Sequence, residues 1–584
     1  MRLTNVAHLR LPFGRLHGYD LAVGEPLRPL PVSFDQRRHV GAGARPGSWM
    51  ALSFRLPEPV DRERLAAAWL AVVRRHGTLR TVFTPGEHGP LLHEHEVGPG
   101  GWVEHAIAPG QAVHEALRDV LDAACSPYER PSHRLCVLET AAGPTVVVGA
   151  DHAHVDMWSM LVIVRDLLAE LGGGAALLPE APAFAEHTRA LEARPPAPDD
   201  VRERWAAVLE ASGGVMPRFP LPLGAPGPQP ERVEVRDVFG ADDSVDVAAQ
   251  AREHGVSTLA LAVSAMTAVT QELAGTPLRA VFPVHSRFEP AWHDSVGWFI
   301  TNAVLEAADP DPRAAAAAIR EALRLGSSPL ADVLAPWGGM PEAPGMLAIS
   351  WLDLRRLPVR VDTAALEAQY VGATIRTDGV MVWFILDETG LHLRCRYPDT
   401  PEAREHVGAW LDLLVARLQQ DARSSVRRAI RLGERAFRVE RATRADIPEI
   451  VALLQDDELG RDRETAEAAR YEAAYDGIAR DRAHYLAVVR DEADDRIVAT
   501  MQLTVIPGLS RGGSTRLQIE GLRVLAAERS QGLGTAMLAW AHEHGRARGA
   551  LLAQVTTDEA RDRARAFYTR LGYETTHVGL KRTL

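Results

Sequence analysis

The chain has 584 residues, more than one ordinary hydrophobic core accommodates, so we expect two or three compact units. Apolar residues make up 46% and charged residues 24%, as in soluble globular proteins, and the net charge of -12 argues against a nucleic-acid or anionic-membrane partner. No charged and then apolar leader opens the chain, and Cys125, Cys136 and Cys395 lack metal-ligand spacing. We expect a cytoplasmic protein with no membrane span. The single lysine, Lys581, excludes a P-loop or a Schiff-base lysine upstream of it.

The first predicted elements alternate between helices and strands. Apolar residues at helical spacing predict an amphipathic helix over 62–76, followed by a strand over 79–83. The β-branched run 145–150 predicts a buried strand, and Asp156 is a plausible N-cap for the apolar helix after it. The Pro- and Gly-rich stretch 217–232 predicts a long connection at a seam between two lobes.

A helix over 257–273 and a strand over 278–284 continue this mixed pattern, which restarts near 423–435. A strand over 437–443 then precedes a helix over 444–457, whose Ile447, Ile450, Val451 and Leu454 share one face. The sequence therefore predicts an α/β (α+β) protein with a small, self-sufficient C-terminal domain.

The segment 151–159, "DHAHVDMWS", places His152, His154 and Asp156 close together. A zinc site needs a further soft ligand, which the neighbouring sequence lacks, so we expect no metal. Two readings stay open: a structural histidine, or a general-base His152 with Asp156 one helical turn further on, where the aspartate holds the loop by pairing with an arginine.

A second chemical motif lies in 517–541, where a predicted strand is followed by Arg529, Gly532 and Gly534 and then by a helix. Glycines at such a turn let backbone N–H groups approach a phosphate, and the helix dipole favours its negative charge. A plain turn is the alternative reading of this spacing alone.

With 561–574 and 576–581, this stretch resembles the GNAT N-acetyltransferase superfamily over 437–584. The resemblance implies a mixed sheet flanked by helices that binds acetyl-CoA or another acyl-CoA and acylates an amine. It implies Glu520 as the base and Tyr568 as the acid, although a solvated carboxylate and a packed aromatic are the alternatives. Arg561 stands where the family often has asparagine. The implied cofactor-binding residues are Leu522, Val524, Arg529, Gln531, Gly532, Leu533, Gly534 and Thr535.

Four further segments, 33–38, 74–83, 151–159 and 294–302, resemble in order the motifs of nonribosomal-peptide condensation domains. These belong with the chloramphenicol-acetyltransferase-like acyltransferases. The resemblance implies a two-lobed pseudo-dimer, with lobes over 1–200 and 201–425 and a tunnel between them. The resemblance also implies a thioester donor, either on the phosphopantetheine of a carrier protein in trans or on CoA.

The resemblance also implies roles for single residues. His152 is the active histidine, Asp156 the structural aspartate, and Arg287 its ion-pair partner, because an unpaired buried carboxylate is costly. Asp151 stands where the family has its first histidine, and it could orient His152 or raise its pKa. Met157 stands where the family has glycine, beside the expected acceptor path.

These resemblances predict a bifunctional acyltransferase of specialised metabolism. The first part passes an acyl or aminoacyl group to an amine or hydroxyl of a small-molecule or peptidyl acceptor, and the second acylates an amine from CoA. One alternative is a condensation-like part that only binds a carrier or peptide, while the GNAT part catalyses. The other is a GNAT part that serves as a CoA-binding regulator.

Overall fold

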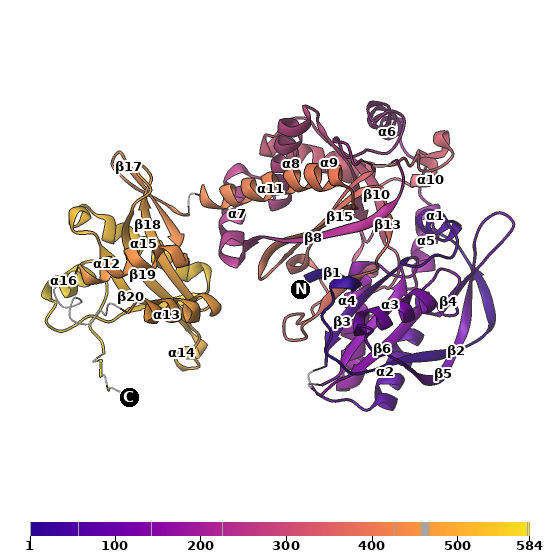
Figure 1. Ribbon diagram of the computed structural model, residues 1–584, viewed down its shortest axis with the longest axis horizontal. Helices are drawn as coiled ribbons and strands as arrows, with labels where there is room; N and C mark the ends of the chain where they lie inside the picture. The colour runs from indigo at the N-terminus through magenta and orange to yellow at the C-terminus, as the bar shows by residue number, and fades with distance from the viewer. Residues whose placement is uncertain are drawn as a thin grey trace. The chain divides into compact units, whose positions relative to one another are not determined.

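The computed structural model describes residues 2–56, 58–141, 143–224, 226–425, 427–456, 467–577, 579, 580 and 582. The chain divides into two compact units, Met1–Gln419 and Gln420–Leu584. Asp457 of the predicted helix, Val578 and Lys581 lie outside the described residues. Because the placement of the two units is not fixed, each is described by itself (Figure 1).

The first lobe of the N-terminal unit is built on an eight-stranded sheet in the order β1-β12-β3-β7-β6-β2-β5-β4. Its strands are β1 (Arg2–Asn5), β2 (Arg15–Leu30), β3 (Trp49–Arg55), β4 (Thr81–Thr84), β5 (Leu91–His105), β6 (His133–Glu139), β7 (Thr145–Asp151) and β12 (Gln369–Gly372). The helices of this part of the chain are α1 (Phe34–Gly41), α2 (Arg62–Arg75), α3 (Val113–Ala124), α4 (Met157–Gly172), α5 (Phe184–Glu192) and α6 (Asp199–Ala211).

Successive side chains of a strand point to opposite faces of the sheet, and in this sheet both faces carry apolar side chains. Leu52 and Phe54 of β3 pack in one core with α2 and α4, whereas Trp49 and Ala51 pack in another core with α3. The predicted helix over 62–76 and strand over 145–150 are confirmed as α2 and β7. The strand expected over 79–83 begins only at Thr81, because Gly77–Arg80 forms a 3-10 turn closed by the Leu79 N–H on the His76 carbonyl.

The second lobe is built on a seven-stranded sheet in the order β10-β9-β11-β14-β15-β8-β13. Its strands are β8 (Gln229–Gly240), β9 (Leu278–His285), β10 (Ile300–Ala307), β11 (Leu347–Asp353), β13 (Arg376–Thr377), β14 (Val380–Asp387) and β15 (Gly390–Pro398). Its helices are α7 (Ala241–His254), α8 (Thr258–Ala274), α9 (Pro312–Leu325), α10 (Leu330–Val333) and α11 (Pro401–Arg423). The helix over 257–273 and the strand over 278–284 are confirmed as α8 and β9.

One strand links the two lobes. β12 lies in sequence among the strands of the second lobe, yet it pairs with β1 and β3 in the sheet of the first. A single boundary near residue 200 therefore does not describe the two lobes fully.

The C-terminal unit has a six-stranded sheet in sequence order, β16 (Ala429–Leu432), β17 (Arg435–Arg441), β18 (His484–Asp491), β19 (Ile497–Ile506), β20 (Thr515–Val524) and β21 (Ala550–Val555). Only β20 and β21 pair in parallel, so the sheet is mixed as expected. The helices are α12 (Ile447–Gln455), α13 (Ala468–Arg480), α14 (Ser510–Gly513), α15 (Leu533–Ala547) and α16 (Asp562–Arg570). α15 packs in one core with Leu517 and Ile519, and α12 packs in a second with Val488 and Ile497.

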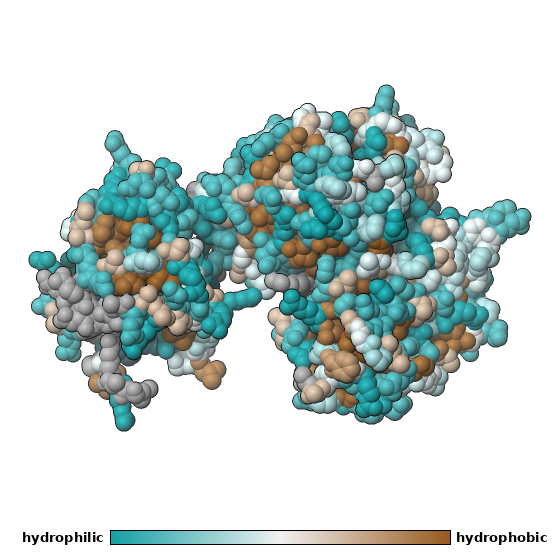
Figure 2. All heavy atoms as spheres, in the orientation of Figure 1, coloured by the Kyte–Doolittle hydropathy of each residue, from teal (hydrophilic) through white to brown (hydrophobic). Residues whose placement is uncertain are grey.

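The visible face in Figure 2 is mostly hydrophilic, with apolar residues in smaller patches. Within the described ranges no single helix is long and apolar enough to cross a membrane, and α7 and α8 pass that test only together, across a bend of 87°.

Candidate functional site

His152 lies where β7 ends and the chain turns into α4. The N–H of His152 donates to the carbonyl of Ser48, 3.0 Å away, which fixes the turn. Its imidazole stacks on the indole of Trp298, with 4.3 Å between ring centroids and 28° between planes. Burial lowers the pKa of His152, and the nearby imidazole of His39 lowers it further. At neutral pH the ring is therefore neutral and able to accept a proton.

Asp156 holds the loop around His152 in place. As N-cap of α4 it accepts the N–H of Ser159 at 2.6 Å, and it also accepts the N–H of Phe299 at 3.1 Å. The Nη2 atom of Arg287 lies 3.1 and 3.2 Å from the two carboxylate oxygens. The structure thus brings together the ion pair that the family resemblance implied, in a setting where both side chains are almost fully buried.

The Asp151 carboxylate bonds to His39 of α1, not to His152. The Nε2 atom of His39 is 3.2 Å from Asp151 Oδ2, and its Nδ1 atom is 3.0 Å from Nη2 of Arg45. A guanidinium can only donate, so Nδ1 accepts and the His39 proton faces Asp151. Burial raises the pKa of Asp151, but hydrogen bonds from His39 and Ser48 oppose this effect, and the pKa lies below its usual range. The charge of Asp151 raises the pKa of His152 as expected, but burial and His39 prevail.

Two further residues of the segment, His154 and Met157, have structural contacts. His154 is completely buried, and its ring meets Phe83 edge to face at 5.3 Å. Met157 is the first residue of α4; its carbonyl accepts the Tyr370 hydroxyl from β12, and its side chain packs against the core of the first lobe. The α-helical backbone at this position accommodates a side chain without strain.

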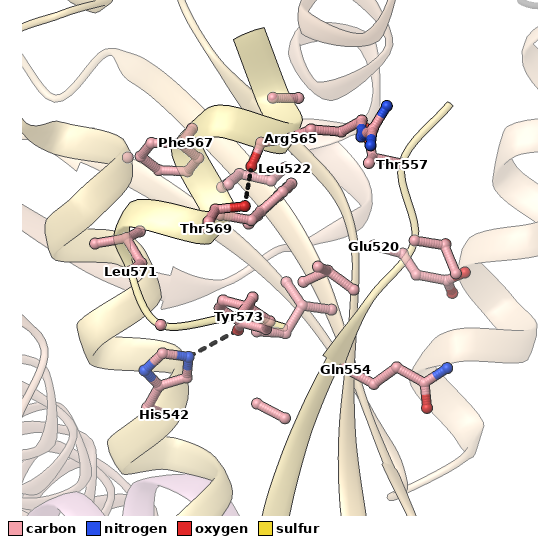
Figure 3. A pocket seen from close by; sticks show the side chains of 18 of the residues that line it. Glu520, Leu522, His542, Gln554, Thr557, Arg565, Phe567, Thr569, Leu571 and Tyr573 are labelled. Atoms are coloured by element: carbon pink, nitrogen blue, oxygen red, sulfur yellow. Dashed lines mark hydrogen bonds between the residues drawn. The ribbon is translucent and has the colours of Figure 1, made fainter. Parts of the chain in front are cut away.

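The second site lies where β20 and β21 separate. The two strands pair from Thr515 with Ala550 to Ile519 with Val555, and β20 then continues to Val524 without β21. Beyond Ile519 the strand retains only β19 as a neighbour. The opening is a cavity of about 2090 Å³ (Figure 3). It is lined by six of the eight expected cofactor-binding residues: Leu522, Val524, Arg529, Gly532, Gly534 and Thr535.

The loop before α15 has the features of an anion site. Gly532 is the N-cap with φ of 92°, a conformation that favours glycine, and no side chain caps the helix. The N–H groups of the first helical turn are therefore available to an anion. A Cβ at Gly534 would meet only ordinary contacts, 3.5 Å from Phe567. Gln531 and Leu533 do not line this cavity: the Gln531 amide donates to the Ala527 carbonyl, and Leu533 is buried.

Arg529, which the sequence predicts as a phosphate-binding cation, already has hydrogen-bond partners within the protein. Its Nε donates to the Val524 carbonyl at 2.9 Å, and its Nη2 lies 2.8 Å from the carboxylate of Asp456 at the end of α12. The side chain therefore fastens the loop to α12, while about half of its surface stays exposed.

Glu520 and Tyr568 line the same cavity from different elements. Glu520 is exposed on β20, and Figure 3 shows its side chain pointing away from the His542–Tyr573 pair. Tyr568, on α16, packs against Phe567 and Tyr573, and burial raises its pKa, so the phenol keeps its proton at neutral pH. Tyr573 lies 2.8 Å from Nε2 of His542, a pair that the sequence did not single out. Among the described residues, no group of three or more His, Cys, Asp or Glu is placed to hold a metal ion.

Comparisons with known proteins agree with this division. Residues 42–323 match the Condensation domain family, and 447–573 match the Acetyltransferase (GNAT) family. The chain is 26% identical over 439 residues to acyltransferase PapA3 of Mycobacterium tuberculosis, covering 68% of this chain and 90% of that one. It is 29% identical over 333 residues to the isonitrile lipopeptide synthase of the same organism, covering 51% of this chain and 13% of that one.

Solved structures show the same fold for the first unit. The PapA2 acyl transferase aligns with a TM-score of 0.63 at 19% identity, over 72% of this chain and all of that one (100%). The first condensation domain of the CDA synthetase aligns with a TM-score of 0.54 at 15% identity, over 68% and 97%. The chain is therefore an acyltransferase in which a condensation domain of the chloramphenicol-acetyltransferase-like fold precedes a GNAT domain.

Proposed function

We propose that the chain carries two acyl-transfer sites, one in each unit, and that His152 is the general base of the first. The observation that carries this proposal is the imidazole of His152, which stacks on the Trp298 ring in a turn fixed by the main-chain hydrogen bond from His152 to Ser48, just before α4 begins. Burial lowers the pKa of this imidazole, so the ring is neutral at neutral pH. A neutral, fixed imidazole takes a proton from an attacking nucleophile effectively.

In this reaction an amine or hydroxyl of a small-molecule or peptidyl acceptor attacks the thioester carbonyl of a phosphopantetheinyl or CoA donor. His152 accepts the proton of the nucleophile as the new C–N or C–O bond forms. The C–S bond then breaks, and protonated His152 gives that proton to the sulfur, which leaves as the thiol. Asp156 and Arg287 take no part in proton transfer; they hold the loop that presents His152. A carrier protein supplied in trans is the proposed donor.

For the GNAT domain we propose direct acylation of an amine in the cavity between β20 and β21. Acyl-CoA supplies the activated thioester. The uncapped first turn of α15, with Gly532, Gly534 and Thr535, holds the pyrophosphate by backbone N–H groups. Glu520 removes a proton from the amine, directly or through water, and Tyr568, which stays protonated, protonates the leaving thiolate.

Intact mass analysis tests the first site. Candidate acceptors are incubated with carrier-loaded aminoacyl or acyl donors and with acetyl-CoA, using wild type, His152→Ala and, as a matched control, the exposed His88→Ala. His152→Ala should lose the carrier-dependent product and keep acetylation from CoA. Full product formation by His152→Ala would favour the alternative, a condensation domain that binds a carrier or peptide without turnover. The observation that favours this alternative is that Asp151 and Met157 depart from the histidine and glycine of the family pattern.

A further inference from the structure

Two arginines lie together on the face of the second-lobe sheet that carries Trp383. Arg394 and Arg396 are two residues apart on β15, and they stand opposite Trp383 and Met381 of β14 in the register of the sheet. Both guanidinium groups lie over the same indole ring: their carbon atoms are 4.7 and 5.2 Å from the centroid of Trp383. The ring face attracts each cation, but it carries no negative charge to neutralise them.

The hydrogen-bonding capacity of this pair is largely unused. Arg394 is 4% exposed, and its Nε and Nη2 atoms are buried with no hydrogen-bond partner in the part of the chain that the structure describes. Nε of Arg396 also lacks a hydrogen-bond partner among the described residues. Nη2 of Arg396 donates to Sδ of Met381 at 3.6 Å, and the carboxylate of Glu231 forms only a long ion pair with Arg396, at 3.9 Å. Burial and, to a smaller extent, the charge of Arg396 lower the pKa of Arg394 to about 10. Burial also raises the pKa of Glu231, which weakens its ability to compensate the two cations.

Arg287, another buried guanidinium, has a carboxylate and other partners that Arg394 and Arg396 lack, although its Nε atom is also without a partner among the described residues. Arg287 bonds Asp156, the Ser159 hydroxyl and two main-chain carbonyls, at distances of 2.7 to 3.2 Å. A buried charge without such partners destabilises the folded protein, and a ligand that brings a negative charge offsets that effect. Paired guanidinium groups suit oxyanions, because each presents N–H donors in a planar fork.

The position of Arg394 relates it to the candidate active site. Its Nη2 atom lies 3.3 Å from the place a Cβ at Gly372 of β12 would take, so the guanidinium lies directly on that strand. Tyr370, two residues earlier on the same face of β12, donates its hydroxyl to the Met157 carbonyl at the start of α4. Two residues along a strand span about 7 Å. The arginine pair and the His152 loop therefore contact the same short strand.

We infer that Arg394 and Arg396 bind an oxyanionic group, a carboxylate, phosphate or sulfate, of a substrate of the condensation domain. The inference rests on the proposed function of that domain and names a chemical feature of its substrate. A carboxylate or sulfate belongs to the acceptor, whereas a phosphate belongs either to the acceptor or to the phosphopantetheine arm of the donor.

Thermal unfolding in matched salts tests the inference without turnover. The full chain carries Gly534→Val, so that the loop of the GNAT domain binds the probe more weakly. Sodium phosphate, sulfate and acetate are compared with chloride at equal ionic strength. At least one oxyanion should raise the Tm of the condensation domain above its value in chloride, and Arg394→Met and Arg396→Met should each abolish that rise. Arg404→Met, an exposed arginine paired with Asp399, is the control and should keep it.

The variants also separate a binding site from a structural one. Arg394→Met removes a buried charge that has no hydrogen-bonded carboxylate, so in chloride it should leave the Tm unchanged or raise it. Equal Tm values of the parent protein in all four salts would overturn the inference, as would an Arg394→Met protein that is destabilised equally in all of them. A phosphate response is followed by phosphopantetheine and pantetheine: stabilisation by the first alone assigns the phosphate to the donor arm, and stabilisation by neither assigns it to the acceptor. Loss of carrier-dependent product in His152→Ala tests the proposed function separately.

Discussion

The two candidate sites differ in how their polar groups are satisfied before any substrate binds. Around His152, Asp156 and Asp151 are buried and bonded within the protein, to Arg287 and to His39. In the GNAT cavity, Glu520 is exposed and the first turn of α15 has no side-chain cap. The first site is therefore assembled by folding, whereas the second leaves donors and a carboxylate for its ligand. Substitutions of the buried aspartates at the first should reduce stability and activity together, while those at the second should reduce activity or binding alone.

Asp156→Ala should give the largest effect. It leaves Arg287 buried without its carboxylate and removes the cap of α4, so we expect a loss of about 3–5 kcal/mol in the free energy of unfolding of the condensation domain. Urea unfolding measures this. Asp200→Ala, which breaks an exposed pair with Arg324, should cost less than about 1 kcal/mol. Similar losses in the two variants would contradict the structural role of Asp156.

Glu520→Gln sharpens the contrast, because it should change catalysis without changing stability. Loss of a general base lowers kcat roughly 10²-fold or more, and the exposed side chain contributes little to packing. Steady-state acetylation kinetics measure kcat and the KM for acetyl-CoA, and the latter should stay unchanged. A kcat close to that of wild type would reject Glu520 as the base.

Gly534→Val should weaken CoA binding with little effect on folding. The added side chain meets only ordinary contacts within the protein, so its main effect is to obstruct the approach of a phosphate to the first turn of α15. We expect about a tenfold rise in the Kd for CoA, measured by calorimetry, as a loss of about 1.4 kcal/mol. Ala539→Val, on the exposed side of the same helix, is the control. Unchanged CoA affinity and retained acetylation would exclude a role for this loop in CoA binding.

His39→Asn should give a smaller effect, visible in the pH dependence of the condensation reaction. His39 lowers the pKa of His152 and also binds Asp151, whose charge raises that pKa. Both consequences of its removal raise the pKa of His152, so the acid limb of the kcat/KM profile should move toward higher pH. The wild-type limb should lie below the ordinary histidine value of about 6.5. A limb that stays in place or moves toward lower pH would contradict this assignment.

Local features of both sites follow from neighbouring residues and could be predicted. The strand β7, the cap at Asp156 and the helix α4 form one continuous segment, as do β20, the Gly532 loop and α15. The family resemblance also supplied Arg287, 131 residues away from Asp156.

What the sequence missed depends on partners that only the folded chain brings together. His39 reaches Asp151 from α1, Trp298 stacks on His152 from the other lobe, and Asp456 binds Arg529 from α12. Arg394 contacts Gly372 because β12 pairs with β3 in the sheet of the first lobe. No local sequence pattern predicts this strand pairing. His39 directly follows the motif 33–38, and Trp298 lies inside the motif 294–302. The motifs therefore located both residues near the site, but they did not predict that the two side chains contact Asp151 and His152.

The central claim is that the chain has two independent acyl-transfer sites. Its most direct test is to measure both reactions, carrier-dependent condensation and acetylation from CoA, by intact mass in the full-length His152→Ala and Glu520→Gln proteins. The account predicts that His152→Ala loses only the first reaction, by roughly 10²-fold or more, and Glu520→Gln only the second. Loss of both reactions in either variant, or of neither in His152→Ala, would contradict it.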